Sequence, residues 1–263
     1  MDEDAEEQPF VVDPLIAELA AKNKVVLSGN PCCPGCGCLL GLKLALQALD
    51  IRVLVLSRGC MGLLTDYPPS VTTVRLSANA VAVAGAIARS HAPVLVYAGD
   101  GATRLYLASV AAAAARNDNV LYICYNNLGS CATGMPGVGT AAPSVNAAYA
   151  ATAAVSHPED YLRKLRKAAQ TPGFRFIEVL TPCPRAGFNA ANTIEVSRAG
   201  VESGFWPLYE VQSKRIEVTY KPPRRETVER FIEMQERLAG LTPQEKQKII
   251  DWVKEGWKMV KWA

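Results

Sequence analysis

The most constraining feature of the sequence is a pair of polar motifs, each of which directly follows an apolar run. Gly99-Asp100-Gly101 closes the run PVLVYAGDG, and Asn126-Asn127 closes the run NVLYICYNN. The helix-like segment TRLYLASVAAAAARND separates the two runs, so together they predict a strand–helix–strand unit with parallel strands. We therefore expect Asp100 and Asn127 to lie side by side at the carboxyl ends of neighbouring strands, where open parallel sheets bind ligands.

The residue types in these motifs indicate the kind of ligand. Carboxylate and amide oxygens suit a hard cation such as Mg²⁺, and glycines allow a ligand to approach the backbone closely. The pattern therefore predicts a clamp for a magnesium ion and a diphosphate group. The stretch that follows, LGSCATGMPGVGTAAPS, is rich in Gly and Pro and has no periodicity. A long irregular stretch inside a domain is usually functional or disordered, and its place next to the motif favours a functional loop.

Strand-like and helix-like segments alternate along most of the chain. The runs IRVLVLS and FRFIEVL are typical of strands buried on both faces, whereas LLGLKLALQALD, ANAVAVAGAIARS and HPEDYLRKLRKAAQ are typical of helices. Residues 186–203 also have helical periodicity. The alternation predicts an α/β fold with a mainly parallel sheet flanked by helices, followed by a C-terminal helical extension.

We expect the chain to divide into three segments. Residues 1–24 form an acidic tail with a short helix, 25–213 form the ligand-binding α/β domain, and 214–263 form the extension. Thr242 followed by Glu245 is a capping-box pattern that starts the last helix. Trp252, Trp257 and Trp262 give this extension more apolar surface than a short helix hides alone, so we expect it to pack on a partner subunit.

Charge and hydropathy exclude several classes of partner. The net charge of +3 is too small to indicate nucleic-acid binding. The start MDEDAEEQ lacks the basic and apolar regions of a secretory signal, and the Ala-rich stretches at 108–115 and 147–154 are too short to cross a membrane. We therefore expect a cytoplasmic protein without nucleic-acid or membrane partners.

Eight cysteines need an explanation in a chain of this kind. In a reducing compartment, clustered cysteines are more often metal ligands or redox groups than structural disulfides. Cys33-Pro-Gly-Cys36 places two thiolates within reach of one centre, and zinc sites, iron–sulfur clusters and redox pairs all use this spacing. Cys60 and Cys183 follow predicted strands and would complete a four-cysteine site at the edge that holds Asp100. The alternative is that both are small buried hydrophobic residues.

Three other cysteines and the two histidines are expected to have no role in metal binding or catalysis. Cys124 lies inside a predicted strand and belongs to the core, and Cys32 and Cys38 are expected to be thiols without a ligand role. His91 and His157 stand in no catalytic motif, so both are expected to be structural.

The motifs CCPGCGC, RGC, GDG…NN followed by ATG, TPCPRAGF and GFWPLYE occur in a specific order. In combination they resemble the thiamine-diphosphate-binding beta subunit of the 2-oxoacid:ferredoxin oxidoreductases, the pyruvate:ferredoxin oxidoreductase or pyruvate synthase family. The resemblance extends from about Asn30 to the C-terminal helix and implies the thiamine diphosphate-binding fold. It also implies a 4Fe–4S cluster on Cys33, Cys36, Cys60 and Cys183.

The resemblance further implies ligands for the cofactor. Magnesium would be held by Asp100, Asn127 and the main-chain carbonyl of Gly129. The cofactor-binding set implied by the family is Gly99, Asp100, Gly101, Ala102, Asn127, Gly129 and Thr133. The implied reaction is oxidative decarboxylation of a pyruvate-like 2-oxoacid to an acyl-CoA and CO₂, with coenzyme A as co-substrate and electrons passing through the cluster to ferredoxin.

The resemblance implies that the chain works with partners. These are alpha, gamma and delta-type subunits or a fused equivalent, together with ferredoxin. In this family the carboxylate that activates the cofactor belongs to a partner subunit, so we expect the chain to be inactive alone.

One departure from the family leaves the substrate open. Ala132 stands where pyruvate-type members commonly have asparagine, and Cys131 and Thr133 are the candidates near the reacting centre. Three alternatives follow: a non-catalytic iron–sulfur electron-transfer or assembly subunit, a variant that acts on an unusual 2-oxoacid, or a non-oxidative thiamine enzyme whose cysteines hold zinc or nothing.

Overall fold

The computed structural model describes Pro14, Ala17 and residues 30–64, 67–68, 70–76, 78–89, 93–129, 146–221 and 227–260, with side chains described as far as residue 255. Several residues singled out in the sequence lie outside these ranges: Cys131, Ala132, Thr133, His91, Trp262 and the side chain of Trp257.

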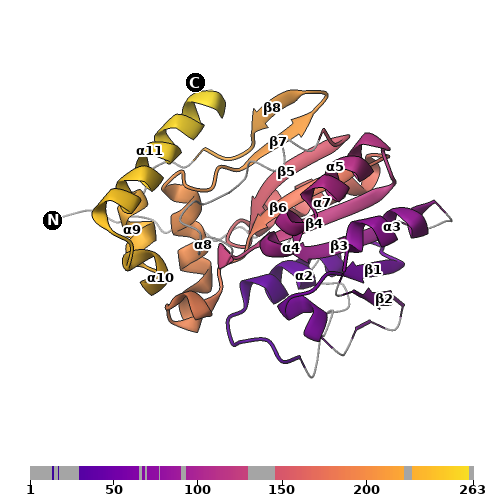
Figure 1. Ribbon diagram of the computed structural model, residues 1–263, viewed down its shortest axis with the longest axis horizontal. Helices are drawn as coiled ribbons and strands as arrows, with labels where there is room; N and C mark the ends of the chain where they lie inside the picture. Colours follow the sequence, from indigo (N-terminus) through magenta and orange to yellow (C-terminus); the bar gives the residue numbers. More distant parts are fainter. Residues whose placement is uncertain are drawn as a thin grey trace.

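One sheet runs through the described chain, with strand order β2-β1-β3-β4-β6-β5-β7-β8 (Figure 1). Its strands are β1 (Val53–Leu56), β2 (Thr72–Arg75), β3 (Val94–Gly99), β4 (Val120–Asn126), β5 (Tyr149–Ala154), β6 (Arg175–Leu180), β7 (Tyr209–Gln212) and β8 (Arg215–Val218). The first six strands are parallel, whereas β7 pairs antiparallel with β5, and β8 with β7. The expected α/β fold with a mainly parallel sheet is confirmed.

The described helices are α2 (Gly37–Ala48), α3 (Ala80–Ala88), α4 (Asp100–Leu105), α5 (Leu107–Ala115), α7 (Pro158–Gln170), α8 (Thr193–Glu202), α9 (Val228–Glu233), α10 (Glu236–Ala239) and α11 (Pro243–Val260). Short 3₁₀ turns occur at η1 (Cys60–Leu63), η3 (Pro184–Ala186) and η4 (Ala190–Asn192). The expected single helix between the two polar motifs is divided at Tyr106, where φ is −113°. The expected helix over 186–203 begins only at Thr193, because η4 precedes it.

The central strands are buried on both faces, as their continuous apolar runs predict. Alternate residues of β3 belong to different clusters. Tyr97 packs in the cluster that contains residues of α2 and α7, and Val96 packs in the cluster that contains residues of α3 and α5. Two helical layers therefore cover the sheet and leave its carboxyl edge as the place where polar side chains collect.

The C-terminal extension packs on the chain's own sheet. Trp206 is completely buried, and its indole N–H donates to the carbonyl of Ala153 at 2.8 Å. Phe231 of α9 and Ile249 of α11 share a hydrophobic cluster with Trp206, and Figure 1 shows α9, α10 and α11 gathered beside α8 at one end of the molecule. The expected boundary at 213/214 falls in the turn between β7 and β8, so the first strand of the extension belongs to the sheet. Packing on a partner subunit stays a prediction.

The capping box at the start of α11 is confirmed. The backbone N–H of Thr242 donates to Glu245 Oε2 at 2.8 Å, and the backbone N–H of Glu245 donates to Thr242 Oγ1 at 3.3 Å. These reciprocal bonds satisfy donors that the first helical turn leaves free. Within the described chain, no helix is both long enough and apolar enough to span a membrane.

Candidate functional site

Four strands deliver polar residues to one edge of the sheet. Strands β1, β3, β4 and β6 are consecutive parallel neighbours, so the segments that follow them leave the sheet side by side. The backbone N–H of Thr181, just after β6, donates to the carbonyl of Asn126 at the end of β4 at 2.8 Å. The expected strand–helix–strand arrangement is confirmed, and it places the Asp100 and Asn127 segments on adjacent strand ends.

The first polar motif joins β3 to α4. Asp100 is the first residue of α4 and is 6% exposed. A Cβ atom at Gly99 would come within 3.0 Å of the Tyr125 ring, whereas a Cβ at Gly101 would meet nothing within 4 Å. Packing within the chain therefore explains Gly99. Gly101 lies in open space, which is where a ligand can approach the backbone at the start of α4.

The second polar motif contains one buried and one half-buried amide. Asn126 is 1% exposed, donates to Glu178 Oε1 at 2.8 Å and accepts the N–H of Leu128, so its role is to hold the end of β4. Asn127 is half-buried, and its Oδ1 accepts the N–H of Gly129 at 2.7 Å. Leu128, between Asn127 and Gly129, has a φ of +59°. This tight turn presents the Asn127 amide and the Gly129 backbone together, beside the Asp100 segment.

A stacked tyrosine pair lies beneath the two motifs. The rings of Tyr97 and Tyr125 are 4.9 Å apart at their centroids, and the Tyr97 hydroxyl donates to the carbonyl of Cys38 at 2.7 Å. A Cβ at Gly59 would lie 2.7 Å from the Tyr125 hydroxyl. Tyr125 therefore lies between the Gly99 backbone and the segment that precedes Cys60. No pattern in the sequence marks Tyr125, because it is one of seven consecutive buried residues in an ordinary strand.

The Cys33–Cys36 turn is held against the segments that follow β6. The N–H of Cys36 donates to the carbonyl of Cys33 at 3.1 Å, and the N–H of Gly37 donates to the carbonyl of Pro182 at 3.3 Å. Gly35 has a φ of +68°, and a Cβ there would lie 2.2 Å from the carbonyl oxygen of Ala190. A side chain at this position would be strained and would clash, so the turn requires glycine.

The four candidate cluster cysteines come from three separate segments of this edge: the Cys33–Cys36 turn, the start of η1 and the residue before η3. Cys33, Cys36 and Cys183 are half-buried, and Cys60 is exposed at the start of η1. Burial raises the pKa of Cys183, and the charges of Cys36, Cys33 and Cys60 raise it further, so the Cys183 thiol lies within electrostatic range of the other three. In the part of the chain that the structure describes, no three His, Cys, Asp or Glu side chains converge closely enough to hold a metal ion.

Hydrogen bonds, burial and neighbouring charges shift the pKa values of the thiols in this turn. The Cys38 thiol and the backbone N–H of Leu39 lower the pKa of Cys36 to about 6, although burial acts in the opposite direction. Burial, followed by the charge of Cys36, raises the pKa of Cys32 to about 12. Cys38 is buried, and its Sγ lies 3.5 Å from Thr181 Oγ1 and 3.9 Å from Asn127 Nδ2. Cys38 therefore connects the cysteine turn with the second polar motif, a placement that the sequence did not indicate.

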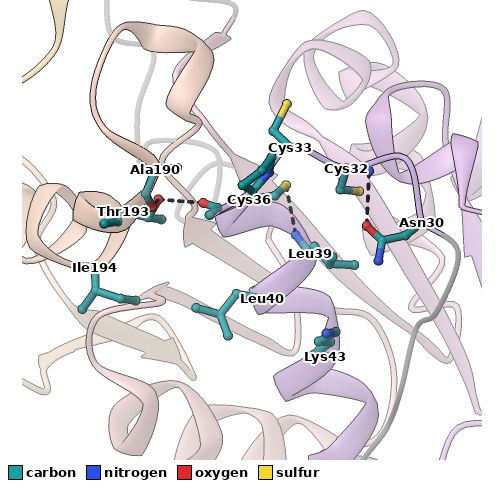
Figure 2. A pocket seen from close by; sticks show the side chains of 13 residues that line it. Asn30, Cys32, Cys33, Cys36, Leu39, Leu40, Lys43, Ala190, Thr193 and Ile194 are labelled. Carbon is teal, nitrogen blue, oxygen red and sulfur yellow. Dashed lines mark hydrogen bonds between the residues drawn. The ribbon is translucent and has the colours of Figure 1, made fainter.

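A cavity of about 470 Å³ opens beside the cysteine turn, between α2 and the start of α8 (Figure 2). Figure 2 shows Cys32 and Cys36 on one side of it, Lys43 on α2, and Thr193 with Ile194 opposite. Thr193 Oγ1 donates to the carbonyl of Gly35 at 2.6 Å. The cavity makes the backbone of the cysteine turn accessible from the side of the sheet that α2 covers.

Cys124 and His157 are both expected to have structural roles. Cys124 is 1% exposed and packs in the core, as expected; Thr103 Oγ1 donates to its sulfur at 3.4 Å. His157 precedes α7, and its Nδ1 is 3.0 Å from Ser156 Oγ, with its ring against Tyr220. These contacts fit the expected structural role of His157. Cys131, Ala132 and Thr133 lie outside the described residues.

Comparisons with known proteins identify a matching domain family and several relatives. The family described as thiamine pyrophosphate enzyme, C-terminal TPP binding domain, matches residues 76–179, a span that contains both polar motifs. The chain is 34% identical over 268 residues to pyruvate synthase subunit PorB of Methanothermobacter thermautotrophicus, with 86% of this chain and 93% of that protein covered. It is 27% identical to ketoisovalerate oxidoreductase subunit VorB of Pyrococcus horikoshii, with 89% and 91% covered.

A solved structure shares the fold. It is the 2-oxoglutarate:ferredoxin oxidoreductase from Magnetococcus marinus with 2-oxoglutarate, coenzyme A and succinyl-CoA bound. The TM-score is 0.51 at 20% sequence identity, with 88% of this chain and 94% of that chain covered.

Proposed function

This chain belongs to the family of 2-oxoacid:ferredoxin oxidoreductase subunits that includes pyruvate synthase subunit PorB, and from this premise we propose that it carries the thiamine diphosphate and a 4Fe–4S cluster of such an enzyme. The observation that supports the proposal most strongly is the meeting of two different ligand sets at one sheet edge. Asp100 and Asn127 would supply hard oxygen ligands, and four cysteines at the same edge would supply soft sulfur ligands.

The first ligand set fits a magnesium ion and a diphosphate. In this proposal the Asp100 carboxylate, the Asn127 amide oxygen and the Gly129 carbonyl hold the ion. The open space above Gly101 supports the proposal, because it leaves room for a phosphate near the backbone N–H groups of Gly101 and Ala102. Gly99 and Thr133 complete the proposed binding set. Once bound, thiamine diphosphate would supply the electron sink for decarboxylation of a 2-oxoacid.

The second ligand set fits an iron–sulfur cluster. Cys33, Cys36, Cys60 and Cys183 are the proposed ligands, and thiolates are the usual protein ligands of 4Fe–4S clusters. Among the described residues no three such side chains converge, so the proposal requires the four thiols to turn toward a common centre when the cluster is inserted. The close packing of the Gly35 and Gly37 backbones against neighbouring segments fixes the turn that carries two of these ligands.

We propose that the chain acts as the beta subunit of a complex with alpha, gamma and delta-type subunits or a fused equivalent. The complete reaction converts a 2-oxoacid and coenzyme A to an acyl-CoA and CO₂, and two electrons leave singly for ferredoxin. The relatives named PorB and VorB are themselves subunits, which supports a multisubunit enzyme. We also propose a cytoplasmic location.

The proposed substrate is a short, pyruvate-like 2-oxoacid. The support is that the PorB relative is 34% identical to this chain, whereas the VorB relative is 27% identical. Ala132 in place of the asparagine of pyruvate-type members is the feature that favours the alternative, an unusual 2-oxoacid.

The test uses the complex, co-expressed with its partner subunits and purified without oxygen. Thiamine diphosphate, iron and acid-labile sulfide are measured, and the visible absorbance is followed while coenzyme A and single 2-oxoacids are added. We expect a brown complex that pyruvate bleaches. A brown complex that bleaches with dithionite but with no 2-oxoacid would favour the non-catalytic alternative, and a colourless protein that contains zinc would overturn the proposal.

A further inference from the structure

We propose that Arg237 is a positioning residue of the candidate magnesium site, which it supports from the C-terminal extension by holding the backbone of Asn127. The inference rests on the proposed function, because it requires Asn127 to be a ligand of the ion.

The contact joins two distant parts of the chain. Arg237 Nη2 donates to the carbonyl oxygen of Asn127 at 3.3 Å, across 110 residues of sequence. The Nε atom of Arg237 is buried and has no hydrogen-bond partner within the described chain. Among the described residues, no carboxylate forms an ion pair with this guanidinium. A half-buried positive charge therefore lies against the loop that carries two of the proposed magnesium ligands.

Helix α10 presents Arg237 from a fixed position. The N–H of Glu236 donates to the carbonyl of Gly187 at 3.2 Å, and a Cβ at Gly187 would lie 2.4 Å from Glu236 Cβ. Leu238 packs in the hydrophobic cluster of the extension, and the buried Gln235 donates to the carbonyl of Phe231. Within helix α10, Glu236 thus contacts the segment after Cys183, and the next residue, Arg237, contacts Asn127.

The position of the Asn127 carbonyl affects both ligands of the turn. The Asn127 side chain already accepts the Gly129 N–H, so the turn from Asn127 to Gly129 moves as a unit. A donor fixed on the Asn127 carbonyl limits rotation of this unit and so orients the amide oxygen. Partners behind the metal ligands typically contribute about 10- to 100-fold in metal affinity.

The test compares matched variants of the complete complex. R237M removes the donor and the charge but keeps the length of the side chain. R230M is the control, because Arg230 lies on neighbouring α9 with a side chain that is 55% exposed and 3.8 Å from Glu195. The dissociation constants of thiamine diphosphate are measured at saturating and limiting Mg²⁺, together with the electron paramagnetic resonance spectrum of bound Mn²⁺. R237K, which keeps a charged donor, tests for rescue.

We expect R237M to raise the dissociation constant by about 10- to 100-fold, most strongly at limiting Mg²⁺. R237K should recover part of this loss, and R230M should equal the wild type. Equal affinities and Mn²⁺ spectra for R237M and the wild type would overturn the inference. Should R237M fail to assemble, R237Q, which removes the charge and shortens the side chain, takes its place: a raised dissociation constant with a changed Mn²⁺ spectrum supports the positioning role, and wild-type values of both refute it. A wild-type complex that binds no thiamine diphosphate would instead refute the proposed function.

Discussion

Replacing Gly101 by alanine separates the demands of folding from those of the cofactor. Gly101 is exposed in the first turn of α4, and a Cβ atom there would have no neighbour within 4 Å. The fold therefore gives no reason for a glycine at this position. The proposed diphosphate does give one, because a methyl group would occupy the space through which a phosphate approaches the backbone.

The two effects have opposite signs. Alanine restricts the unfolded chain without creating a clash, which should stabilise the cofactor-free protein by about 0.4–1 kcal/mol. For a domain of this size, that corresponds to a rise of about 1–4 °C in melting temperature. An extra methyl group in a packed site costs about 1–3 kcal/mol. We therefore expect the dissociation constant of thiamine diphosphate to rise by about 5- to 150-fold.

The assay measures the melting temperature of the complex without cofactor and the affinity for thiamine diphosphate with Mg²⁺. G240A is the control, because Gly240 lies after α10 with a negative φ, and a Cβ there would be 3.5 Å from the nearest atom, an ordinary contact. G99A is a poorer probe, since its methyl group would press on the Tyr125 ring at 3.0 Å. If G101A binds the cofactor as tightly as G240A and the wild type, the diphosphate does not approach Gly101 and the reasoning fails.

Three further predictions concern separate parts of the molecule. C60S should lower the iron content and visible absorbance of the complex, whereas C124S, which changes a core thiol, should leave both unchanged; equal iron loss in the two would contradict the ligand assignment. K164M should lower the free energy of unfolding, measured by urea titration, by about 3–5 kcal/mol. The reason is that the buried Lys164 ammonium donates to Asp160 Oδ2 at 2.5 Å, and its loss leaves that carboxylate unpaired. A loss below about 1 kcal/mol would refute this. Burial lowers the pKa of His157, so the unfolded chain binds the proton first as the pH falls, and stability decreases below about pH 6.5. H157Q should flatten the dependence of the free energy of unfolding on pH, measured with urea between about pH 7 and about pH 5.5. An unchanged dependence would contradict the assignment.

The unit formed by β3, α4, α5 and β4 could be predicted because its signals are local. Continuous apolar runs specify strands buried on both faces, and Asp100 and Asn127 mark where those runs stop. The parallel register of β3 with β4 then follows from the helical connection between them. The position of the candidate site on the fold was therefore accessible from the sequence.

Other strands had no such signal. Strand β5 has the sequence YAATAA, and alanine has little preference for strands, so only its pairing with β6 and β7 makes this segment extended. The turn between β7 and β8 uses Ser213 and Lys214, both with positive φ, where a sequence signal would be Asn-Gly. The hairpin and the antiparallel edge of the sheet were missed for this reason.

The contacts that organise the site depend on tertiary packing. Arg237 reaches Asn127 only because α9, α10 and α11 pack against α8 and Trp206. Cys38 reaches Asn127 only because the turn before α2 is bonded to Pro182. No local pattern marks these residues, since each acts through a neighbour that is distant in sequence.

The most direct test of the central claim follows electrons from the proposed thiamine site to the proposed cluster. The oxygen-free complex is mixed with pyruvate and coenzyme A, and bleaching of the visible absorbance is compared among the wild type, D100N and C60S. We predict rapid bleaching in the wild type and none in either variant, although dithionite still bleaches any clusters that they retain. Bleaching by pyruvate in both variants at the wild-type rate would show that electrons do not pass through the site formed by Asp100 and Cys60.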